Sequence, residues 1–421
     1  MKITILTAGS QGDIQPFVAL ALGLQAAGEE VTLCTGRRYA AFVTRYGLNF
    51  APMNDDFLNF ADTDEGRAAV DGGSKFGLIN KVKPLIRKML DDQWQAAQHS
   101  QAIIYHPKTL GAPYIAEKLA IPVFMSIPLP LYTPTRAFPS PILPQSLRLG
   151  GIFNRLSYSV IHLIKLPYMG VINDWRASIG LPKRSWRADD LSRADGTPVP
   201  VLYSYSPAVV PTPPDYPAST HVTGYWFLDA APGWQSPADL QAFLDAGAPP
   251  VYVGFGSMTG ADPQAKARLV VDALHQAGQR GVIASGWGGL QASDLPDDIF
   301  MLDRAPHDWL FPRTAAVVHH GGAGTTAAGL RAGKPTVICP FFGDQPFWGQ
   351  WVCQLGVGTQ PIPQKRLTVE SLANAIRAAV TNPDICRRAE ALGAQIRAEH
   401  GVANAVHIIQ QSAELPVAHP R

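Results

Sequence analysis

The stretch VVHHGGAGTTAAGLRAGKPTVICPFFGDQ, residues 317–345, decides the fold class. Its pattern predicts a buried strand, a glycine-rich turn with two histidines, the start of a helix, and a second buried strand that ends in Asp-Gln. A strand, a helix and a further strand in this order are typical of α/β proteins with parallel sheets. The ends of its two strands are also where a ligand is expected, because open α/β sheets bind ligands beyond the carboxyl ends of their strands.

The turn after the first of these strands has the features of a phosphate site. Three of its residues, Gly321, Gly322 and Gly324, lack a side chain and allow positive φ, so the backbone can approach a ligand closely. Thr325 and Thr326 are predicted to open the helix, whose unpaired N–H groups and dipole favour an anion. His319 or His320 can add a further hydrogen-bond donor. The alternative is a glycine-rich turn without a ligand.

Asp344 and Gln345 follow the second strand, which is predicted over residues 336–340. A carboxylate beside a carboxamide suits vicinal hydroxyl groups, since the first accepts hydrogen bonds and the second both donates and accepts them. The two ends of the stretch can therefore hold an activated sugar. The alternative is an Asp-Gln pair that only caps a loop.

HHGGAGTT followed by RAGKPTVICPFFGDQ closely resembles the donor-binding signature of the inverting UDP-glycosyltransferase superfamily, and is most similar to its sterol glucosyltransferase branch. Four more stretches match that branch in chain order: GSQGDIQPFVALALGL around Ser10, GYWFLD from Gly224, PPVYVGFGSM from Pro249 and RAPHDWLFPR from Arg304. The resemblance implies the GT-B fold, in which two Rossmann-like domains with parallel sheets face a central cleft. It also implies a nucleotide-sugar donor in the second domain and an acceptor in the first.

The alternation of strand and helix patterns runs through the whole chain and restarts after its middle. Strands are predicted at residues 3–7, 31–34, 102–105, 123–126 and 198–205, and then at 251–255, 281–284 and 299–302. The proline-rich run PTPPDYP favours an extended connector. We therefore expect a first domain at 1–215, a linker at 216–235 and a second domain at 236–403. By the resemblance, residues 404–421 pack back onto the first domain.

Asp13 is the candidate general base. It follows the first predicted strand, at a position that faces the cleft of an open sheet, and a partly desolvated carboxylate is a suitable base for a hydroxyl group. The alternative is that Asp13 caps the helix predicted at 16–27. In the sterol and antibiotic glycosyltransferases that the chain resembles, the aspartate of this GSxGD motif is the proposed base. No histidine lies near this turn in sequence, so we expect no rival to Asp13.

The resemblance also implies which residues contact the donor. Arg304, Ala305 and His307 match the loop that recognises uracil, where Arg304 would stack on the base and backbone groups at Ala305 would hydrogen-bond it. Plant relatives carry a ribose-binding Glu where Ala327 stands, so another group must bind the ribose. The predicted set comprises Ser10, Gly12, Ser257, Arg304, Ala305, His307, His319, Gly321, Gly322, Gly324, Thr325, Asp344 and Gln345, with Ser257 and His319 on the phosphates.

Composition excludes several other classes of function. The net charge of +2 gives no strong field for nucleic acid. No run of about 18 apolar residues predicts a membrane span, and four widely spaced cysteines without a CxxC pair favour reduced thiols and a cytosolic protein. Peripheral contact with a membrane is a further hypothesis, through residues 81–88 or 163–168. The aspartate pairs predict no metal site; we expect no cofactor, and transfer that survives EDTA.

We therefore predict a glycosyltransferase that moves glucose from UDP-glucose to the 3β-hydroxyl of a sterol or similar lipid-like alcohol. By the resemblance, residues 57–89 and 128–175 would line the acceptor site. One alternative is a polyketide, triterpenoid or glycopeptide acceptor with a dTDP-sugar. Others are a nucleotide-sugar epimerase on the same architecture and a non-catalytic sugar-nucleotide binder. A nicotinamide-dependent dehydrogenase is disfavoured, since no GxGxxG follows the first strand.

Overall fold

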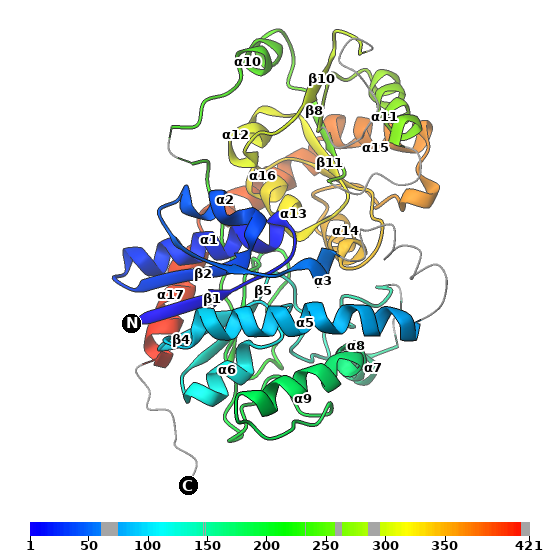
Figure 1. The fold of residues 1–421 in the computed structure, drawn as a ribbon. Coiled ribbons are helices and arrows are strands. Elements are labelled where there is room, and N and C mark those ends of the chain that lie inside the picture. Colours follow the sequence, from blue (N-terminus) through cyan, green and yellow to red (C-terminus); the bar gives the residue numbers. More distant parts are fainter. Residues whose placement is uncertain are drawn as a thin grey trace.

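Two parallel β-sheets organise the protein. The computed structural model describes residues 1–59, 75–145, 147, 149–231, 233–256, 263–284 and 295–413. Within these residues, one sheet has seven strands in the order β3-β2-β1-β4-β5-β6-β7, and the other has five in the order β10-β9-β8-β11-β12. Helices pack beside both sheets (Figure 1). The predicted α/β class with two parallel sheets is thus confirmed.

The first sheet is built from short buried runs. Its strands are β1 (Lys2–Leu6), β2 (Glu30–Gly36), β3 (Asn49–Met53), β4 (Ala102–Tyr105), β5 (Val123–Ile127), β6 (Val201–Tyr203) and β7 (Thr220–Val222). β4 and β5 are buried at every position, as expected for strands covered on both faces. β1 pairs with β2 on one side and β4 on the other. The strand order reverses between β1 and β4, so a ligand crevice is expected at their carboxyl ends.

The helices of the first domain fall into two groups. α1 (Gln11–Ala26), η1 (Arg37–Tyr39) and α2 (Ala40–Thr44) follow the first strands. The second group comprises α3 (Asp56–Asn59), α5 (Lys75–Ala97), α6 (Ala112–Leu119), α7 (Gly151–Ser157), α8 (Val160–Lys165), η3 (Leu166–Tyr168) and α9 (Met169–Ser178). Figure 1 shows α1 and α2 on the side nearer the second domain, and α5, α6 and α9 on the far side.

The second sheet repeats the design on a smaller scale. Its strands are β8 (Val251–Gly254), β9 (Gly281–Ala284), β10 (Ile299–Leu302), β11 (Ala316–His319) and β12 (Thr336–Ile338). β8 pairs with β9 and with β11, so this order reverses between β8 and β11. The second ligand crevice is therefore expected where β8 and β11 end, directly before the glycine-rich turn.

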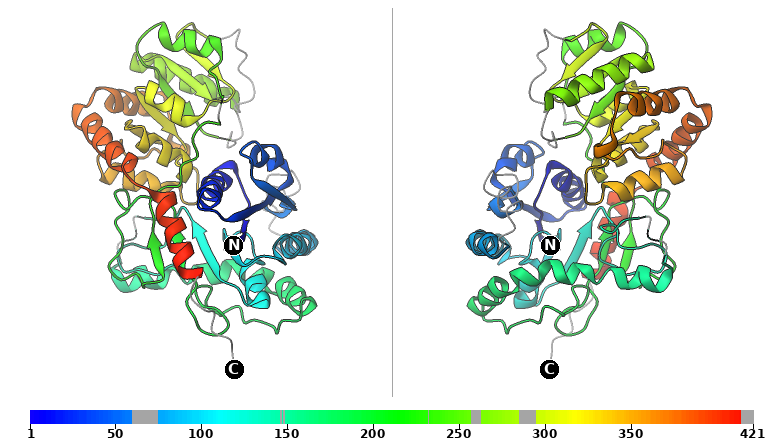
Figure 2. Two further views of the ribbon diagram at one scale, coloured as in Figure 1. Left: turned by 90° about the vertical axis from the view of Figure 1, so that its left-hand side faces the viewer. Right: turned by 90° about the vertical axis from the view of Figure 1, so that its right-hand side faces the viewer.

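The helices of the second domain surround its sheet. They are α10 (Ala238–Asp245), α11 (Pro263–Ala277), α12 (His307–Leu310), η5 (Phe311–Arg313), α13 (Ala323–Arg331), α14 (Gln345–Gln354), η6 (Gln364–Arg366), α15 (Val369–Thr381) and α16 (Pro383–Arg397). α13 and α14 point toward the first domain (Figures 1 and 2). Within the stretch 317–345, α13 begins after the glycine-rich turn, at Ala323, and α14 begins at the last residue, Gln345.

The last described helix returns to the first domain. α17 (Gly401–Ala413) lies beside α1, and its buried Ala405, Val406 and Ile409 share a hydrophobic cluster with residues of α1. The approach is close, because a Cβ built at Gly23 would lie 2.3 Å from Val402 Cγ1. Residues 404–413 of the predicted C-terminal segment therefore pack against the first domain. Figure 2 shows this helix in red.

The chain between the two sheets differs from a plain extended linker. β7 lies inside the segment 216–235 and pairs in parallel with β6, so the first sheet continues to Val222. Gly224 then turns with a φ of +95°, where a side chain would meet Gly401 at 3.2 Å. Asn404 donates a hydrogen bond to the Thr223 carbonyl at 3.0 Å. The connector and the start of α17 thus cross in contact.

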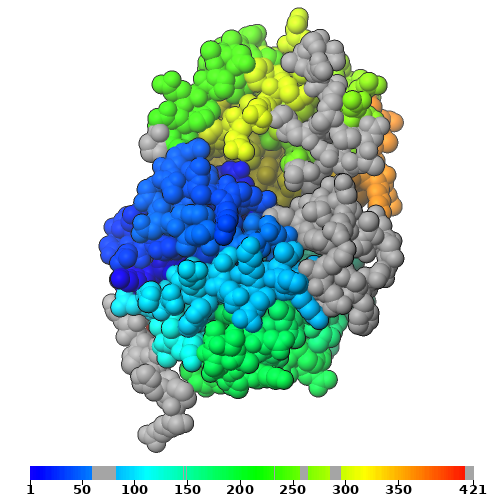
Figure 3. All heavy atoms as spheres, viewed as in Figure 1, coloured from blue at the N-terminus to red at the C-terminus, as the bar shows by residue number. Residues whose placement is uncertain are grey.

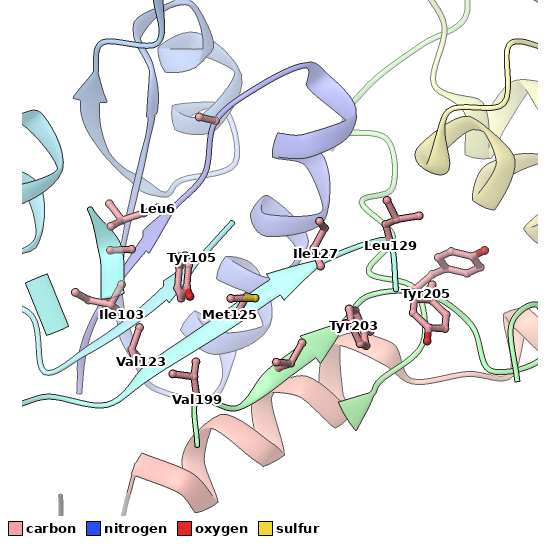
Figure 4. Packing of buried hydrophobic residues seen from close by; sticks show 14 of the residues in the cluster. Leu6, Ile103, Tyr105, Val123, Met125, Ile127, Leu129, Val199, Tyr203 and Tyr205 are labelled. Carbon is pink, nitrogen blue, oxygen red and sulfur yellow. The ribbon is translucent and has the colours of Figure 1, made fainter. Parts of the chain in front are cut away.

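Aromatic and aliphatic side chains fill the space beneath the first sheet. Figure 4 shows Tyr105, Met125, Tyr203 and Tyr205 among apolar side chains of neighbouring strands. The Tyr203 hydroxyl accepts a hydrogen bond from the Thr133 N–H at 2.8 Å, so its polar end is satisfied although the ring is buried.

The first domain (blue to green) and the second meet across the middle of the molecule (Figure 3).

The α17 contact makes a prediction about stability. Ile409 is fully buried against the first domain, so Ile409→Ala should lower the free energy of unfolding by about 2–5 kcal/mol. His407→Ala, an exposed position on the same helix, should change it by less than about 0.5 kcal/mol. Urea unfolding followed by circular dichroism measures both. Equal midpoints for the two variants would contradict the packing described.

Candidate active site

Asp13 lies at the crevice of the first sheet, inside the first turn of α1. The helix begins at Gln11, earlier than the predicted residue 16, with Ser10 as its N-cap. One carboxylate oxygen of Asp13 accepts hydrogen bonds from the Ser10 N–H at 2.8 Å and the Ser10 hydroxyl at 3.0 Å. Asp13 therefore stabilises the helix start from the third helical position, with one oxygen left for other partners.

That second oxygen faces two groups from the end of β4. Lys108 Nζ lies 2.8 Å from Asp13 Oδ1, and His106 Nε2 lies 3.7 Å from the same atom. His106 Nδ1 accepts a hydrogen bond from the Lys108 N–H at 3.2 Å, so in the neutral ring the proton sits on Nε2, toward Asp13. The carboxylate is thus held between a cation and an imidazole N–H.

The charges of this cluster follow from burial and pairing. Burial of Asp13 raises the pKa of its carboxyl, but the Lys108 ammonium and the hydrogen bonds from Lys108 and Ser10 outweigh it, so the pKa is lowered overall. Burial lowers the pKa of His106 to about 3, so its ring is neutral at physiological pH. Asp13 is therefore a carboxylate beside a neutral histidine, with a side chain 17% exposed.

His106 corrects the expectation that no histidine lies near Asp13. It is distant in sequence, but β4 neighbours β1, so the residues after both strands meet at one edge of the sheet. The missed signal was the run His106-Pro-Lys108 directly after a buried strand. Gly9 leaves room for the contact between Asp13 and Lys108. Its φ is +131°, and a Cβ there would lie 2.3 Å from the Asp13 carboxylate and 2.9 Å from Lys108 Nζ.

The glycine-rich turn forms the crevice of the second sheet. Gly321 has a φ of +96°, and a Cβ there would come within 2.8 Å of Ile338 and 3.1 Å of the Gln345 carbonyl. Gly322 is the N-cap of α13, so Gly324 and Thr325 lie in its first turn. The helix thus begins two residues before the predicted Thr325, and its first N–H groups point into the crevice as an anion site requires.

His319 ends β11 and is fully buried. Its Nδ1 accepts the Gly321 N–H at 2.9 Å, so in the neutral ring Nε2 carries the proton. Nε2 has no hydrogen-bond partner among the described atoms. Burial, with His320 adding to it, holds the pKa of His319 well below its usual value. A buried N–H without a partner is costly, and an acceptor such as a phosphate oxygen would satisfy it.

The segments that follow the two strand-order reversals lie close together. A Cβ built at Gly324 would lie 3.8 Å from the Gly12 Cα, so the first turns of α1 and α13 nearly touch. Burial raises the pKa of Asp344, a hydrogen bond from Trp348 opposes this, and the Asp13 carboxylate raises it further. The Asp13 carboxylate of the first domain is therefore close enough to Asp344 of the second to affect its pKa.

Asp344 and Gln345 differ in how their side chains are held. Asp344 is the N-cap of α14 and accepts a hydrogen bond from Trp348 Nε1 at 3.0 Å on Oδ2. The Gln345 side-chain oxygen accepts the Phe341 N–H at 2.7 Å and is buried. Gln345 thus has a structural role in this turn besides the predicted contact with a sugar, and Asp344 is fixed in orientation by its tryptophan partner.

The predicted uracil loop follows β10. Arg304 is exposed and Ala305 half-buried, so both can meet a ligand. The His307 ring stacks on Phe311 with centroids 4.2 Å apart and meets Tyr252 edge-on. Burial lowers the pKa of His307 to about 4, so the ring is neutral. This stack fixes the base of the loop, and the stacking of the exposed Arg304 on a nucleobase stays a prediction.

Other predicted positions have mixed outcomes. Ser257 lies outside the described residues, as does the part 60–74 of the range predicted to line the acceptor site. Ala327 is buried in α13. Within the range 128–175 predicted to line the acceptor site, Phe138, Tyr158 and Trp175 are buried core residues, and Phe138 also meets Phe347 and Trp351 of α14 edge-on. The described part of the chain holds no group of three or more His, Cys, Asp or Glu side chains suited to a metal ion.

The comparisons with known proteins agree with this geometry. Residues 3–139 match the glycosyltransferase family 28 N-terminal domain, and residues 270–411 match the erythromycin biosynthesis protein CIII-like C-terminal domain. A sterol 3-beta-glucosyltransferase of Aspergillus terreus is 39% identical over 98% of this chain and 30% of its own length. The sterol 3-beta-glucosyltransferase UGT80A2 of Arabidopsis thaliana is 39% identical over 96% of this chain and 64% of its own length.

The chain belongs to the UDP-glycosyltransferase superfamily, in its sterol 3-beta-glucosyltransferase-like branch. It spans about a third of the length of its fungal relatives and less than two thirds of the plant one. The solved structure of the glycotransferase of kitacinnamycin shares its fold, with a TM-score of 0.73 and 19% identity over 98% of this chain and 99% of the other. The glycosyltransferase thus has the expected GT-B fold.

The unpartnered N–H of His319 makes a prediction for nucleotide binding. His319→Ala in this glycosyltransferase should weaken the binding of UDP by about 10- to 100-fold, because a charge-assisted hydrogen bond to phosphate is lost. His275→Ala, at an exposed position of α11, should bind UDP as the unchanged protein does. Isothermal titration calorimetry measures both. An unchanged dissociation constant for His319→Ala would remove this residue from the donor site.

Proposed function

We propose that the protein transfers glucose from UDP-glucose to the 3β-hydroxyl of a sterol or a similar lipid-like alcohol, with inversion at the anomeric carbon. The observation that carries this proposal is the meeting of two crevices, one with a base and one with a phosphate-type turn. Asp13 and the first turn of α13 belong to different domains, yet Gly12 and Gly324 are close neighbours. A donor held in the second domain would present its sugar to the first.

The second domain supplies groups of the right kind for a sugar nucleotide. The N-terminus of α13 and His319 Nε2 offer N–H donors to the diphosphate, and Ser257 is proposed as a further contact. Asp344 would accept hydrogen bonds from sugar hydroxyls, and the loop at Arg304 and Ala305 would hold the uracil. The negative charge of the leaving UDP is met by these groups, and we propose that transfer needs neither a metal ion nor a cofactor.

The first domain would supply the base. The acceptor oxygen attacks the anomeric carbon as the bond to the β-phosphate oxygen breaks, and Asp13 takes the hydroxyl proton, so UDP leaves with the bonding electron pair. One in-line displacement inverts the configuration. Lys108 keeps Asp13 ionised, and His106 limits the directions that its second oxygen can face. Both act on the base and not on the substrate.

The sterol acceptor rests on relatives that are named sterol 3-beta-glucosyltransferases and match nearly this whole chain. The structures that share the fold are less than 25% identical and carry no argument about the acceptor. Incubation with UDP-[14C]glucose and a panel of cholesterol, sitosterol and several antibiotic aglycones tests the proposal. A labelled steryl glucoside supports it. Transfer to aglycones alone, or an epimerised donor without an acceptor, would assign one of the alternative functions.

The role of Asp13 predicts a specific defect. Asp13→Asn should lower the rate of glucosyl transfer by about 10²- to 10⁴-fold, because no group then accepts the proton, while UDP binding stays nearly normal. Asp384→Asn, an exposed position on α16, is the matched control and should keep full activity. Rates come from labelled transfer and binding from calorimetry. Wild-type transfer by Asp13→Asn would exclude it as the base.

Lys108 predicts a change in the pH profile. Its ammonium lowers the pKa of Asp13, so Lys108→Met should raise that pKa and move the acidic limb of the kcat/KM profile to higher pH. Lys108→Arg keeps the charge and should keep the profile close to that of the wild type. Lys365→Met, exposed in the second domain, controls for the loss of a cation elsewhere. An acidic limb in the same place for Lys108→Met would show that the ion pair does not tune the base.

A further inference from the structure

Exposed apolar side chains gather in one segment of the first domain. The described part of the chain has nine exposed large hydrophobic side chains, and all but Met1 and Phe342 lie between residues 147 and 166. They are Leu147, Leu149, Ile152, Leu156, Leu163, Ile164 and Leu166, and we call them the α7–α8 surface. Ile152 and Leu156 are 73% and 66% exposed. Clusters of this kind mark interaction sites more often than isolated exposed side chains do.

The helix α7 buries polar residues and exposes apolar ones, which is the reverse of an ordinary surface helix. Its buried residues are the polar Asn154 and Ser157, while Ile152 and Leu156, one turn apart, face outward. Asn154 Nδ2 donates to the Arg136 carbonyl at 2.9 Å, and the Ser157 hydroxyl accepts the Ser140 N–H at 2.8 Å. The helix is therefore fastened to the protein by hydrogen bonds and leaves its apolar face to whatever lies outside.

A groove continues this apolar face between the helices. It has a volume of about 450 Å³ and is lined by Leu143, Leu156, Ser157, Ser159, Val160, His162, Leu163, Trp186 and Arg187. The Arg187 guanidinium lies over the Trp186 ring, 4.9 Å from its centroid. Such a combination of an aromatic ring, a cation and aliphatic side chains suits the membrane interface, where lipid headgroups meet acyl chains.

The segment of the chain that carries this surface has basic residues and no acidic ones. Between residues 118 and 173 the chain has five basic residues, Lys118, Arg136, Arg148, Arg155 and Lys165, and neither Asp nor Glu. The nearby carboxylates are engaged within the protein: Asp190 pairs with Lys165 at 2.5 Å, and Asp215 accepts the Thr135 hydroxyl at 2.5 Å. Arg155 is exposed on α7 beside the apolar face. The surface therefore complements an anionic one.

We propose that the α7–α8 surface docks onto the surface of an anionic lipid bilayer. The helices α7 and α8 would lie in the interface, with their aliphatic side chains among the acyl chains and Arg155 and Arg187 at the headgroups. Protein interfaces favour aromatic side chains, Met and Arg at their centres and use few Leu contacts as anchors. The predominance of Leu and Ile here fits lipid better. No described helix is long and apolar enough to cross the membrane, so contact would be confined to its surface.

The position of the surface links it to the candidate active site. α7 is bonded to the loop that contains Arg136 and Ser140. Phe138 of that loop meets Phe347 and Trp351 of α14 edge-on, with centroids 5.8 Å and 6.3 Å apart. α14 begins directly after Asp344. Docking there would bring a membrane-resident acceptor near the cleft. This consequence rests on the proposed function, whereas the docking itself does not.

Vesicle flotation of the full chain tests the proposal without any enzymatic readout. The protein should float with vesicles of phosphatidylcholine and phosphatidylglycerol, and much less with phosphatidylcholine alone. Ile152→Ser combined with Leu156→Ser should lower the bound fraction at least about tenfold, since two inserted side chains lose their apolar burial. Ile152→Leu with Leu156→Ile keeps the apolar face and should bind normally. Arg155→Glu should weaken binding, and Arg387→Glu, exposed on α16, should not.

Three results would overturn the proposal. The first is equal flotation of the Ser variant and the wild type, and the second is no flotation of the wild type with either vesicle. The third is a dimer in light scattering that dissociates in the Ser variant, which would assign the surface to a second copy of the chain. Failure to glucosylate a sterol would refute the proposed function and leave the flotation result standing, so the two failures can be told apart.

Discussion

The carboxyl ends of two parallel sheets carry the whole functional arrangement. In each sheet the strand order reverses once, between β1 and β4 and between β8 and β11, and at each reversal the following segments diverge and leave a crevice. Asp13, His106 and Lys108 come from the first crevice, and His319 and the glycine-rich turn come from the second. Because the first turns of α1 and α13 approach each other, these two groups of residues lie close together between the domains, and we propose that they form one site.

The position of these residues at the ends of the sheets explains why backbone groups are proposed to bind the donor and a side chain is proposed as the base. The proposed donor side has a helix N-terminus, a tight turn that requires glycine and a buried imidazole N–H, all of which suit a phosphate that must be held without covalent chemistry. The acceptor side needs one group that changes protonation, and there the ion pair with Lys108 stabilises the charged form of Asp13. The Asp13 carboxylate also contributes to raising the pKa of Asp344, so the two side chains lie within electrostatic reach of each other.

Much of the fold was predictable from local patterns. Continuous apolar runs such as 102–105, 281–284 and 299–302 match strands β4, β9 and β10 residue for residue, because such runs are typical of strands in parallel sheets that helices cover. The edge strands β3 and β7 were missed, since Asn49–Met53 contains a proline and Thr220–Val222 is short. The start of α1 was placed too late because Pro16 suggested a first turn, whereas the Ser10 and Asp13 pair begins the helix earlier.

The sequence analysis did not predict contacts between site residues that are distant in the chain. Asp13, His319 and Asp344 follow strands within recognisable motifs, but His106 and Lys108 reach Asp13 only because β4 pairs with β1, which sequence spacing does not reveal. The inverted face of α7 was equally hidden: Ile152 and Leu156 suggest core by their chemistry, and only the burial of Asn154 and Ser157 shows the opposite orientation.

A crystal structure of the protein with UDP-glucose and a sterol analogue tests most directly that both domains act on one sugar. We predict the diphosphate at the first turn of α13, the glucose beside Asp344, and the acceptor oxygen within about 2.6–3.2 Å of the Asp13 carboxylate. A glucose bound away from Asp344, or an acceptor oxygen held by another residue with Asp13 still paired only to Lys108, would contradict the account.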